Sequence, residues 1–379
     1  MIKKMLTPLR FVASDDFRLR IAKWFTRQLS RTPIGCYMLR QIYGIEAPYL
    51  SREVFGMKFR SPIGLGAGYD RNGTMINAMG AMGFGFIEIG SITPKPQHND
   101  SHNTLYRLEG DRALLYYSEI ESQGVERVMK NIKHHNPNII VGCNLAKGEK
   151  TPREDAPMDY LRMFRPLYQW CDYFTINICC NTAEAHFVPR DKDSIMAILT
   201  PLFDFRRGQN QYRPILLNIS PDLTNEELDM VTDIMIDTPC DGIVACGGTI
   251  GRYNLGNSTQ TMHALGRIPG ALCGQPLKER ALQVVRHIYN RSKGTYPIIG
   301  CGGIATAEDA MQMLEAGATL VQITSEYIYR GGNAIKDIGA GLNERLRKLQ
   351  AKAKKEAEMA AKQEAENKQA EEQSPTENI

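Results

Sequence analysis

Short apolar runs alternate with helical patterns along the chain from residue 61 onward. Most runs are followed by a segment in which apolar residues recur at helical spacing, as in residues 226–236, 277–289 and 306–316. Eight such units predict eight parallel strands joined by helices, the pattern of an α/β protein with a closed (β/α)8 TIM barrel. The predicted strands are residues 63–65, 86–89, 139–144, 173–178, 215–219, 242–246, 298–301 and 320–323.

An open, doubly wound sheet is the alternative arrangement of alternating strands and helices. Nothing after the first predicted strand resembles a dinucleotide-binding turn, so the pattern favours the barrel. We predict three regions: an amphipathic helical module (1–48), the barrel (49–345) and a charged tail (346–379) that is helical or disordered.

The amino-terminal module is basic and carries aromatic residues at helical spacing. Ser14 offers a helix cap, and Pro33 and Gly35 divide the segment into two short helices. Such helices could lie on an anionic lipid surface. The alternative is that the same face packs against the barrel, and spacing alone slightly favours packing. The apolar positions are Phe17, Ile21, Trp24, Phe25 and Leu29 in the first helix and Tyr37, Met38, Ile42 and Tyr43 in the second.

Composition narrows the class of protein. The chain has 379 residues, 42% of them hydrophobic, and a net charge of +4, which allows one large α/β domain with extensions. Its nine cysteines lack zinc-site spacing and disulfide-scaffold density, which favours a reducing compartment. It has no apolar run of membrane-span length and no signal-peptide pattern. We predict a protein that is soluble or lies on a membrane surface, without a metal site or nucleic-acid partner.

Residues 172–182 (DYFTINICCNT) are the predicted chemical centre. An apolar run that ends in amides and thiols is typical of a buried parallel strand whose carboxyl end opens into a ligand site. The alternative for this stretch alone is a core strand followed by a polar loop with incidental cysteines.

Three further strand ends are suited to a flat or phosphorylated ligand. Residues 300–303 (GCGG) and 322–325 (QITS) end the seventh and eighth units, where TIM barrels commonly bind phosphate. Residues 64–73 (GLGAGYDRNG) lack bulk before Tyr69, so backbone can approach a ring closely, and Arg71 offers a cation. The alternative in each case is ordinary turn chemistry.

These segments resemble the dihydroorotate dehydrogenases, in particular the membrane-associated, quinone-using class. The resemblance extends from about residue 5 to residue 345. It implies a (β/α)8 barrel that binds FMN, with an amino-terminal helical pair that admits quinone at the membrane surface. Its most specific motifs are residues 64–73, 83–97, 172–178, 221–223, 274–277 and 297–304.

The resemblance also implies a reaction and a set of site residues. Dihydroorotate gives a hydride to the flavin while a side-chain base removes a proton, and quinone takes the electrons. Cys180 stands at the base position, where the quinone class uses serine and the soluble class uses cysteine. Substrate contacts would be Arg71, at a family lysine position, Asn177 and Asn181. Flavin contacts would be Ala67, Gly68, Ser91, Asn144, Asn177, Gly274, Gly303, Thr324 and Ser325.

Several positions depart from the family's pattern. Residues 116–121 (YYSEIE) replace Asn-Arg-Met-Gly-Phe-Asn, Asn218 replaces a lysine, and residues 246–249 (CGGT) replace Thr-Asn-Thr-Thr. After Cys180, the family's proline and Pro-Gly turn are missing. Glu326 takes a small-residue position beside the phosphate loops, where a carboxylate lowers affinity unless it points away or is paired.

We therefore predict an FMN-mediated dihydroorotate dehydrogenase of pyrimidine biosynthesis that acts on dihydroorotate, or a relative of it, and on quinone. Two alternatives stay open: a catalytically lapsed barrel that serves as a binding or scaffold protein, and an FMN enzyme with a different substrate. The predicted location is cytoplasmic and peripheral on the inner face of the cell membrane, through residues 1–45.

Overall fold

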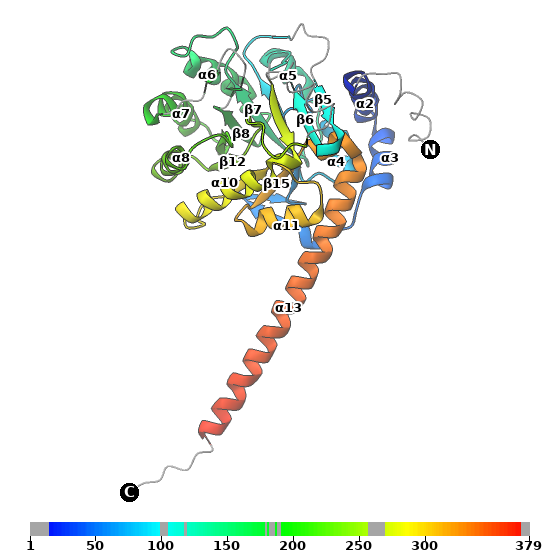
Figure 1. Cartoon of the computed structure of the whole chain (residues 1–379), viewed down its shortest axis with the longest axis vertical. Coiled ribbons are helices and arrows are strands. Elements are labelled where there is room, and N and C mark those ends of the chain that lie inside the picture. The colour runs from blue at the N-terminus through cyan, green and yellow to red at the C-terminus, as the bar shows by residue number, and fades with distance from the viewer. Residues whose placement is uncertain are drawn as a thin grey trace.

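The barrel is present, with its strands closed in the order β11-β12-β14-β15-β3-β4-β7-β8 (Figure 1). The structure is a computed structural model that describes residues 15–98, 105–116, 120–178, 180–181, 186–187, 191–256 and 270–372. All eight predicted strands are confirmed, and their ends differ from the prediction by at most three residues. They are β3 (Ile63–Leu65), β4 (Phe86–Ile92), β7 (Ile140–Ala146), β8 (Tyr173–Asn177), β11 (Ile215–Ile219), β12 (Gly242–Ala245), β14 (Ile298–Cys301) and β15 (Leu320–Ile323).

Helices cover the outside of the barrel and connect successive strands (Figure 1). Two of them begin with a reciprocal cap, in which Thr224 pairs with Glu227 and Thr306 with Asp309, so the local sequence determines where each helix starts. The helices around the barrel are α4 (Ile76–Met82), α5 (Val125–Ile132), α6 (Ala156–Leu167), α7 (Lys192–Arg207), α8 (Asn225–Asp237), α10 (Lys278–Arg291), α11 (Ala307–Glu315) and α12 (Ser325–Arg330).

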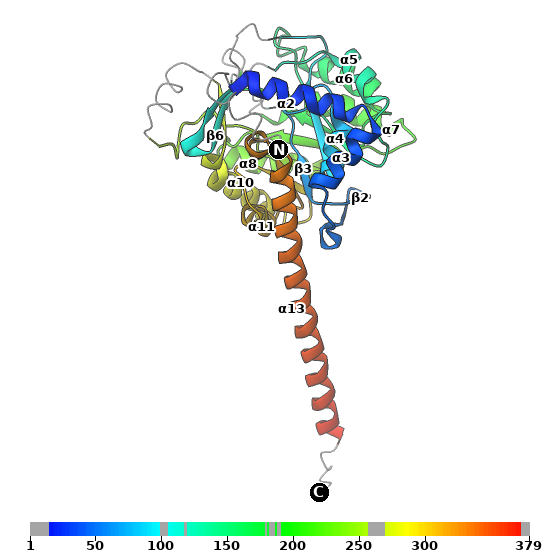
Figure 2. The same ribbon diagram turned by 90° about the vertical axis from the view of Figure 1, so that its right-hand side faces the viewer.

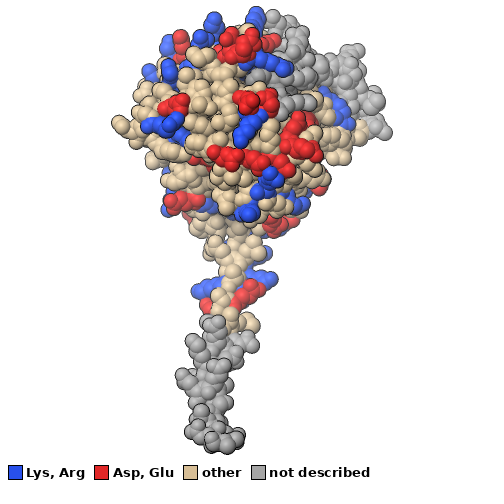
Figure 3. All heavy atoms as spheres, turned by 90° about the vertical axis from the view of Figure 1, so that its left-hand side faces the viewer, with Lys and Arg blue, Asp and Glu red and all other residues tan. Residues whose placement is uncertain are grey.

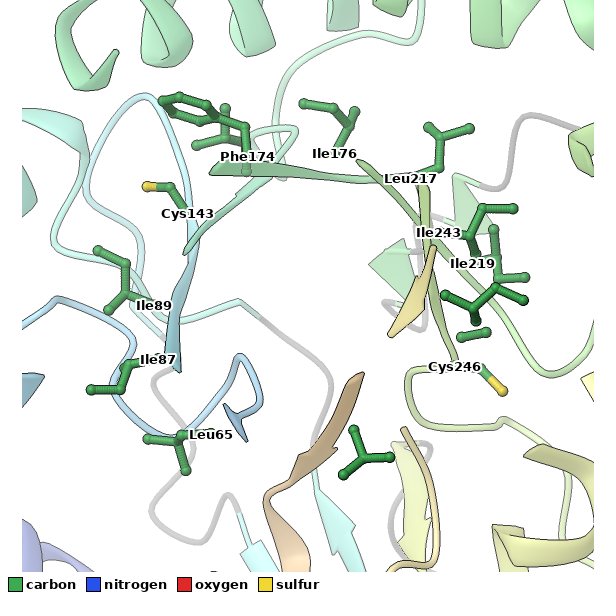
Figure 4. Close-up of a cluster of buried hydrophobic side chains, with 14 of the residues drawn as sticks. Leu65, Ile87, Ile89, Cys143, Phe174, Ile176, Leu217, Ile219, Ile243 and Cys246 are labelled. Atoms are coloured by element: carbon green, nitrogen blue, oxygen red, sulfur yellow. The ribbon is translucent and has the colours of Figure 1, made fainter. Parts of the chain in front are cut away.

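The barrel interior changes from apolar to polar along the strands. Near the amino ends, Phe86, Tyr173 and Leu216 belong to one buried cluster, which the hairpin of β1 (Arg52–Val54) and β2 (Met57–Phe59) completes. Because side chains alternate along a strand, the next inward positions on β4 and β11 are Glu88 and Asn218. Outward-facing side chains pack between the strands and helices (Figure 4), among them Leu65, Ile87, Phe174 and Leu217.

A three-stranded antiparallel sheet lies outside the barrel, and the sequence analysis did not predict it. Its order is β13-β6-β5, with β5 (Leu105–Leu108), β6 (Ala113–Tyr116) and β13 (Ala271–Gly274). A short hairpin of β9 (Cys180–Asn181) and β10 (His186–Phe187) follows β8. Three 3-10 turns complete the connections: η2 (Pro48–Leu50), η3 (Glu109–Asp111) and η4 (Gln275–Leu277).

The two predicted amino-terminal helices are α2 (Asp15–Ser30) and α3 (Pro33–Tyr43). The predicted cap Ser14 lies outside the described residues. The predicted break at Pro33 and Gly35 is wrong in detail, because Pro33 is the first residue of α3 and Gly35 lies inside it. Thr32 caps α3 by accepting a hydrogen bond from Gly35 N–H at 3.1 Å, and proline is compatible with a first helical turn.

The chain continues into one long helix, α13 (Gly332–Glu372). Its first turns pack on the barrel through Ile335, Ile338 and Leu342, and the remainder extends away from the domain (Figures 1 and 2). Of the two alternatives for the tail, the structure has the helix through residue 372.

One side of the barrel carries charges of both signs. Acidic and basic side chains are interspersed on the side of the barrel that lies on the left of Figure 1 (Figure 3). Within the described residues, no helix combines the length and the apolar character needed to cross a bilayer.

Candidate functional site

A cavity of about 410 Å³ opens at the carboxyl ends of the barrel strands. Its wall is completed by the antiparallel sheet, through Leu114, Tyr116 and Cys273, and by helix α2. Arg71 lines this cavity. So do all nine residues that the resemblance assigns to a flavin: Ala67, Gly68, Ser91, Asn144, Asn177, Gly274, Gly303, Thr324 and Ser325.

Hydrogen bonds fix the polar floor of the cavity. The Ser91 hydroxyl donates to Asn144 Oδ1 at 2.5 Å, and Asn177 Nδ2 donates to Ser91 Oγ at 3.1 Å. Asn144 Nδ2 donates at 2.9 Å to the buried carboxylate of Glu88. Held in this way, the three side chains lose little rotamer freedom when a ligand binds.

The loop after β14 approaches helix α10 so closely that residue 303 must be glycine. Its φ is +70°, and a Cβ there would lie 2.6 Å from the Cα of Lys278. Gln275 Nε2 donates to the Gly303 carbonyl at 2.7 Å, which ties the loop to the end of β13. The loops after β14 and β15 thus form one edge of the cavity, at the position where phosphate is predicted to bind.

Glu326 does not face the cavity, although it follows Ser325 directly. Its residue is only 3% exposed, and Arg112 Nη2 donates to both carboxylate oxygens at 2.7 and 2.8 Å. Arg330 Nη1 lies 3.5 Å from the same carboxylate. Because the Glu326 carboxylate is paired with arginines, it does not repel a phosphate bound in the cavity.

Arg71 is held at the cavity wall by an acid from the altered loop. Its Nη1 pairs with the Glu121 carboxylate, and its Nε donates to the Gly68 carbonyl at 3.2 Å. Both side chains of the ion pair are partly exposed, at 24% for Arg71 and 38% for Glu121. An arginine in this state offers a ligand its remaining N–H donors, with part of its charge offset by Glu121.

Tyr116 occupies space that residue 248 leaves open. A Cβ on Gly248 would lie 2.7 Å from the Tyr116 hydroxyl oxygen, whereas a Cβ on Gly247 would meet nothing within 4 Å. Burial raises the pKa of the Tyr116 phenol, so it is a neutral hydrogen-bonding group at physiological pH. The two departures from the family's pattern at positions 116 and 248 are thus coupled by contact.

Cys180 and Asn181 form β9, but their side chains lie outside the described part of the structure, as do Cys179 and Thr182. The base and substrate roles of Cys180 and Asn181 therefore stay predictions. Asn177, three residues earlier, ends β8 and lines the cavity.

The mouth of the cavity is formed by one face of α2, which contributes Leu19, Arg20, Lys23 and Arg27. The Lys23 ammonium lies 4.8 Å from the centre of the Tyr69 ring. Trp24 and Phe25 do not line the cavity and are 54% and 56% exposed. The helix therefore lines the cavity with some of its residues and presents aromatic residues to solvent.

Comparison with known proteins places this fold and cavity in one family. The family profile described as Dihydroorotate dehydrogenase matches residues 49–346. A protein named dihydroorotate dehydrogenase (quinone) from Christiangramia forsetii is 35% identical over 345 residues, which covers 91% of this chain and 99% of that protein. The chain belongs to the dihydroorotate dehydrogenase family.

A second relative and a solved structure match the chain over a similar length. The dihydroorotate dehydrogenase (quinone) of Thermosynechococcus vestitus is 36% identical over 329 residues, covering 86% of this chain and 89% of its own length. The crystal structure of DHODH from Eimeria tenella in complex with ferulenol superposes with a TM-score of 0.79 at 25% identity, over 89% of this chain and 92% of that one. The match therefore spans the barrel and cavity as a whole.

Several cavity residues of this dehydrogenase-family chain escaped sequence reasoning. Cys273 lies on an unpredicted strand, and the basic face of α2 was not assigned to the site. Gln322 and Cys301 lie within the predicted ligand segments 322–325 and 300–303, although neither was assigned a contact of its own. Glu88, which does not line the cavity, was named only as part of the 83–97 motif and was given no role.

Proposed function

We propose that the protein is an FMN-dependent dihydroorotate dehydrogenase that passes electrons to quinone. The observation that carries this proposal is the convergence of all nine predicted flavin positions on one cavity, in a chain of this family. These residues lie on or directly after seven different strands, so the cavity can offer one ligand contacts from many sides.

The residues present suit FMN. Gly303 and its neighbouring loop offer backbone close to a phosphate, and the amides of Asn144 and Asn177 offer hydrogen bonds to the polar edge of a flat ring. The carboxylate of Glu326, the acid next to Ser325, is committed to arginines. When bound, FMN would supply the two-electron redox chemistry that the protein side chains lack.

The protein's own part is to hold the substrate and to take a proton. Arg71 and Asn177 would orient dihydroorotate, and Asn181 would add a further contact. Cys180 would accept the proton, since a thiol with an ordinary pKa of about 8.5 can reach the thiolate form near neutral pH. This assignment rests on the family position of Cys180.

Quinone would reach the cavity beside α2. The exposed aromatic residues Phe17, Trp24 and Phe25, with basic residues on the same helix, suit a peripheral location on an anionic membrane. We place the protein in the cytoplasm, peripheral on the inner face of the cell membrane, with residues 1–45 as the attachment. The relatives named as quinone enzymes support this reading.

A second candidate, an FMN enzyme with a different substrate, is favoured by the contact of Tyr116 with Gly248 and by the Arg71–Glu121 pair. The Tyr116 phenol stands where the family's pattern has an amide. The Glu121 carboxylate offsets the positive charge of Arg71, which would otherwise bind a substrate carboxylate. Both candidates share the cofactor and differ in the reductant.

One experiment separates the two candidates. The purified protein is examined by visible absorption, and dihydroorotate is then added without oxygen. A flavin spectrum that dihydroorotate bleaches is expected. A flavin spectrum that only another reductant bleaches would favour the second candidate, and a protein that binds no added FMN would refute both.

A further inference from the structure

Glu88 lies in the middle of the barrel, one layer below the cavity, and is 1% exposed. Three donors converge on its carboxylate: Asn144 Nδ2 on Oε1 at 2.9 Å, and on Oε2 both Gln322 Nε2 at 2.8 Å and the Tyr173 hydroxyl at 3.1 Å. Burial raises the pKa of Glu88, and these hydrogen bonds oppose the rise. The group therefore serves its neighbours as a buried acceptor.

The carboxylate determines how the surrounding amides are turned. All three neighbours donate to the Glu88 carboxyl group, so Asn144 directs its NH2 toward Glu88 and its carbonyl oxygen away from it. That oxygen accepts from the Ser91 hydroxyl, and Ser91 Oγ in turn accepts from Asn177 Nδ2. The hydrogen bonds thus run in one direction, from Asn177 through Ser91 and Asn144 to Glu88.

We call this series of hydrogen bonds, from Asn177 through Ser91 and Asn144 to Glu88, the relay. Its first three members line the cavity, and so does Gln322. Glu88 itself lies beneath them. We propose that Glu88 is a positioning residue whose carboxylate sets the hydrogen-bonding polarity of the cavity floor. The inference rests on the proposed function, because FMN, with both donors and acceptors on its ring edge, is the ligand that would respond to this polarity.

Replacing the carboxylate by an amide inverts the relay. In Glu88→Gln, the new NH2 must face either Asn144 or the two donors Gln322 and Tyr173. If the new NH2 faces Asn144, it meets one donor instead of two, so we expect this orientation. Asn144 must then turn its own NH2 toward Ser91. The Ser91 hydroxyl would donate to Asn177 instead, so Asn177 would turn as well.

The Glu88→Gln/Asn144→Asp variant restores the original direction. The amide introduced at position 88 would donate to the carboxylate introduced at position 144, and its carbonyl oxygen would still accept from Gln322 and Tyr173. The new carboxylate would still accept from the Ser91 hydroxyl, so Asn177 would keep its orientation.

The test measures FMN dissociation from the purified full-length protein, by the fluorescence of released flavin, together with the visible spectrum of bound flavin. For Glu88→Gln we expect Kd to rise at least about fivefold and the flavin bands to shift, because a mismatched buried hydrogen bond costs about 1–3 kcal/mol. The matched control is Tyr173→Phe, which removes one donor from the same carboxylate and leaves the relay intact. Its Kd is expected to change less than about threefold.

The inference is supported if Glu88→Gln loses affinity, Tyr173→Phe does not, and the Glu88→Gln/Asn144→Asp variant binds FMN more tightly than Asn144→Asp alone, which carries the same change at the flavin contact. Equal effects of Glu88→Gln and Tyr173→Phe, or a double variant that binds FMN no more tightly than Asn144→Asp alone, would overturn it. If Glu88→Gln does not fold, the comparison of the Glu88→Gln/Asn144→Asp variant with Asn144→Asp decides the question, because both variants keep a group at position 88 that can bond to position 144. A wild-type protein that binds no FMN overturns the proposed function and the inference together.

Discussion

Gly247 and Gly248 form a natural pair of test and control sites for the remodelled cavity. Neither has a positive φ, so alanine is compatible with the backbone at both positions. At 248 the added Cβ would lie 2.7 Å from the Tyr116 hydroxyl oxygen, 3.1 Å from the Ala271 Cβ and 3.2 Å from the Leu272 carbonyl oxygen. At 247 it would meet nothing within 4 Å.

The expected difference follows from these distances. Overpacking at 248 costs about 1–3 kcal/mol of unfolding free energy. Gly247→Ala instead gains about 0.4–1 kcal/mol, because the unfolded chain loses freedom. The unfolded-state gain is common to both variants, so Gly248→Ala is expected to be about 1–3 kcal/mol less stable than Gly247→Ala.

Urea unfolding of both variants measures this difference directly. Adding Tyr116→Phe to Gly248→Ala removes the oxygen in the closest contact, so we expect much of the lost stability to return. Equal unfolding free energies for Gly247→Ala and Gly248→Ala would refute the contact between Tyr116 and position 248.

Three further predictions follow from the site. Cys180→Ala should abolish flavin reduction by dihydroorotate, because the proton loses its acceptor, while Cys180→Ser should retain part of it; an undiminished anaerobic rate in the alanine variant argues against the base assignment. Glu326→Gly should destabilise the protein by about 1–3 kcal/mol in thermal unfolding without improving FMN affinity, since its arginine partners lose their anion; tighter FMN binding would show the opposite. Trp24→Ser/Phe25→Ser should reduce sedimentation with anionic vesicles, whereas Tyr289→Ser, an exposed aromatic on α10, should not; equal sedimentation of the two variants would exclude α2 as the attachment.

The sequence predicted the barrel well because each strand is recognisable from its own residues. Buried parallel strands are short apolar runs, and each run is followed by the helix that connects it to the next strand. The same rule located Asn177 and Ser325 at strand ends, where TIM barrels place their ligands. The antiparallel sheet was missed because β5, β6 and β13 are four-residue strands outside the repeating units.

Contacts between distant residues were beyond sequence reasoning. Arg112 and Glu326 are 214 residues apart, so the pairing of Glu326 could be offered only as an exception. Glu88 and Gln322 are 234 residues apart, and neither residue type indicates a shared network. The coupling of Tyr116 to Gly248 likewise needs the strand register that brings β6 beside β13.

We propose that this protein oxidises dihydroorotate through bound FMN and passes the electrons to quinone. The most direct measurement supplies dihydroorotate and a soluble quinone to the FMN-loaded protein and quantifies orotate and quinol. We predict that the two products form in equal amounts and that neither forms when dihydroorotate is omitted. A protein that holds FMN but makes no orotate would contradict the claim.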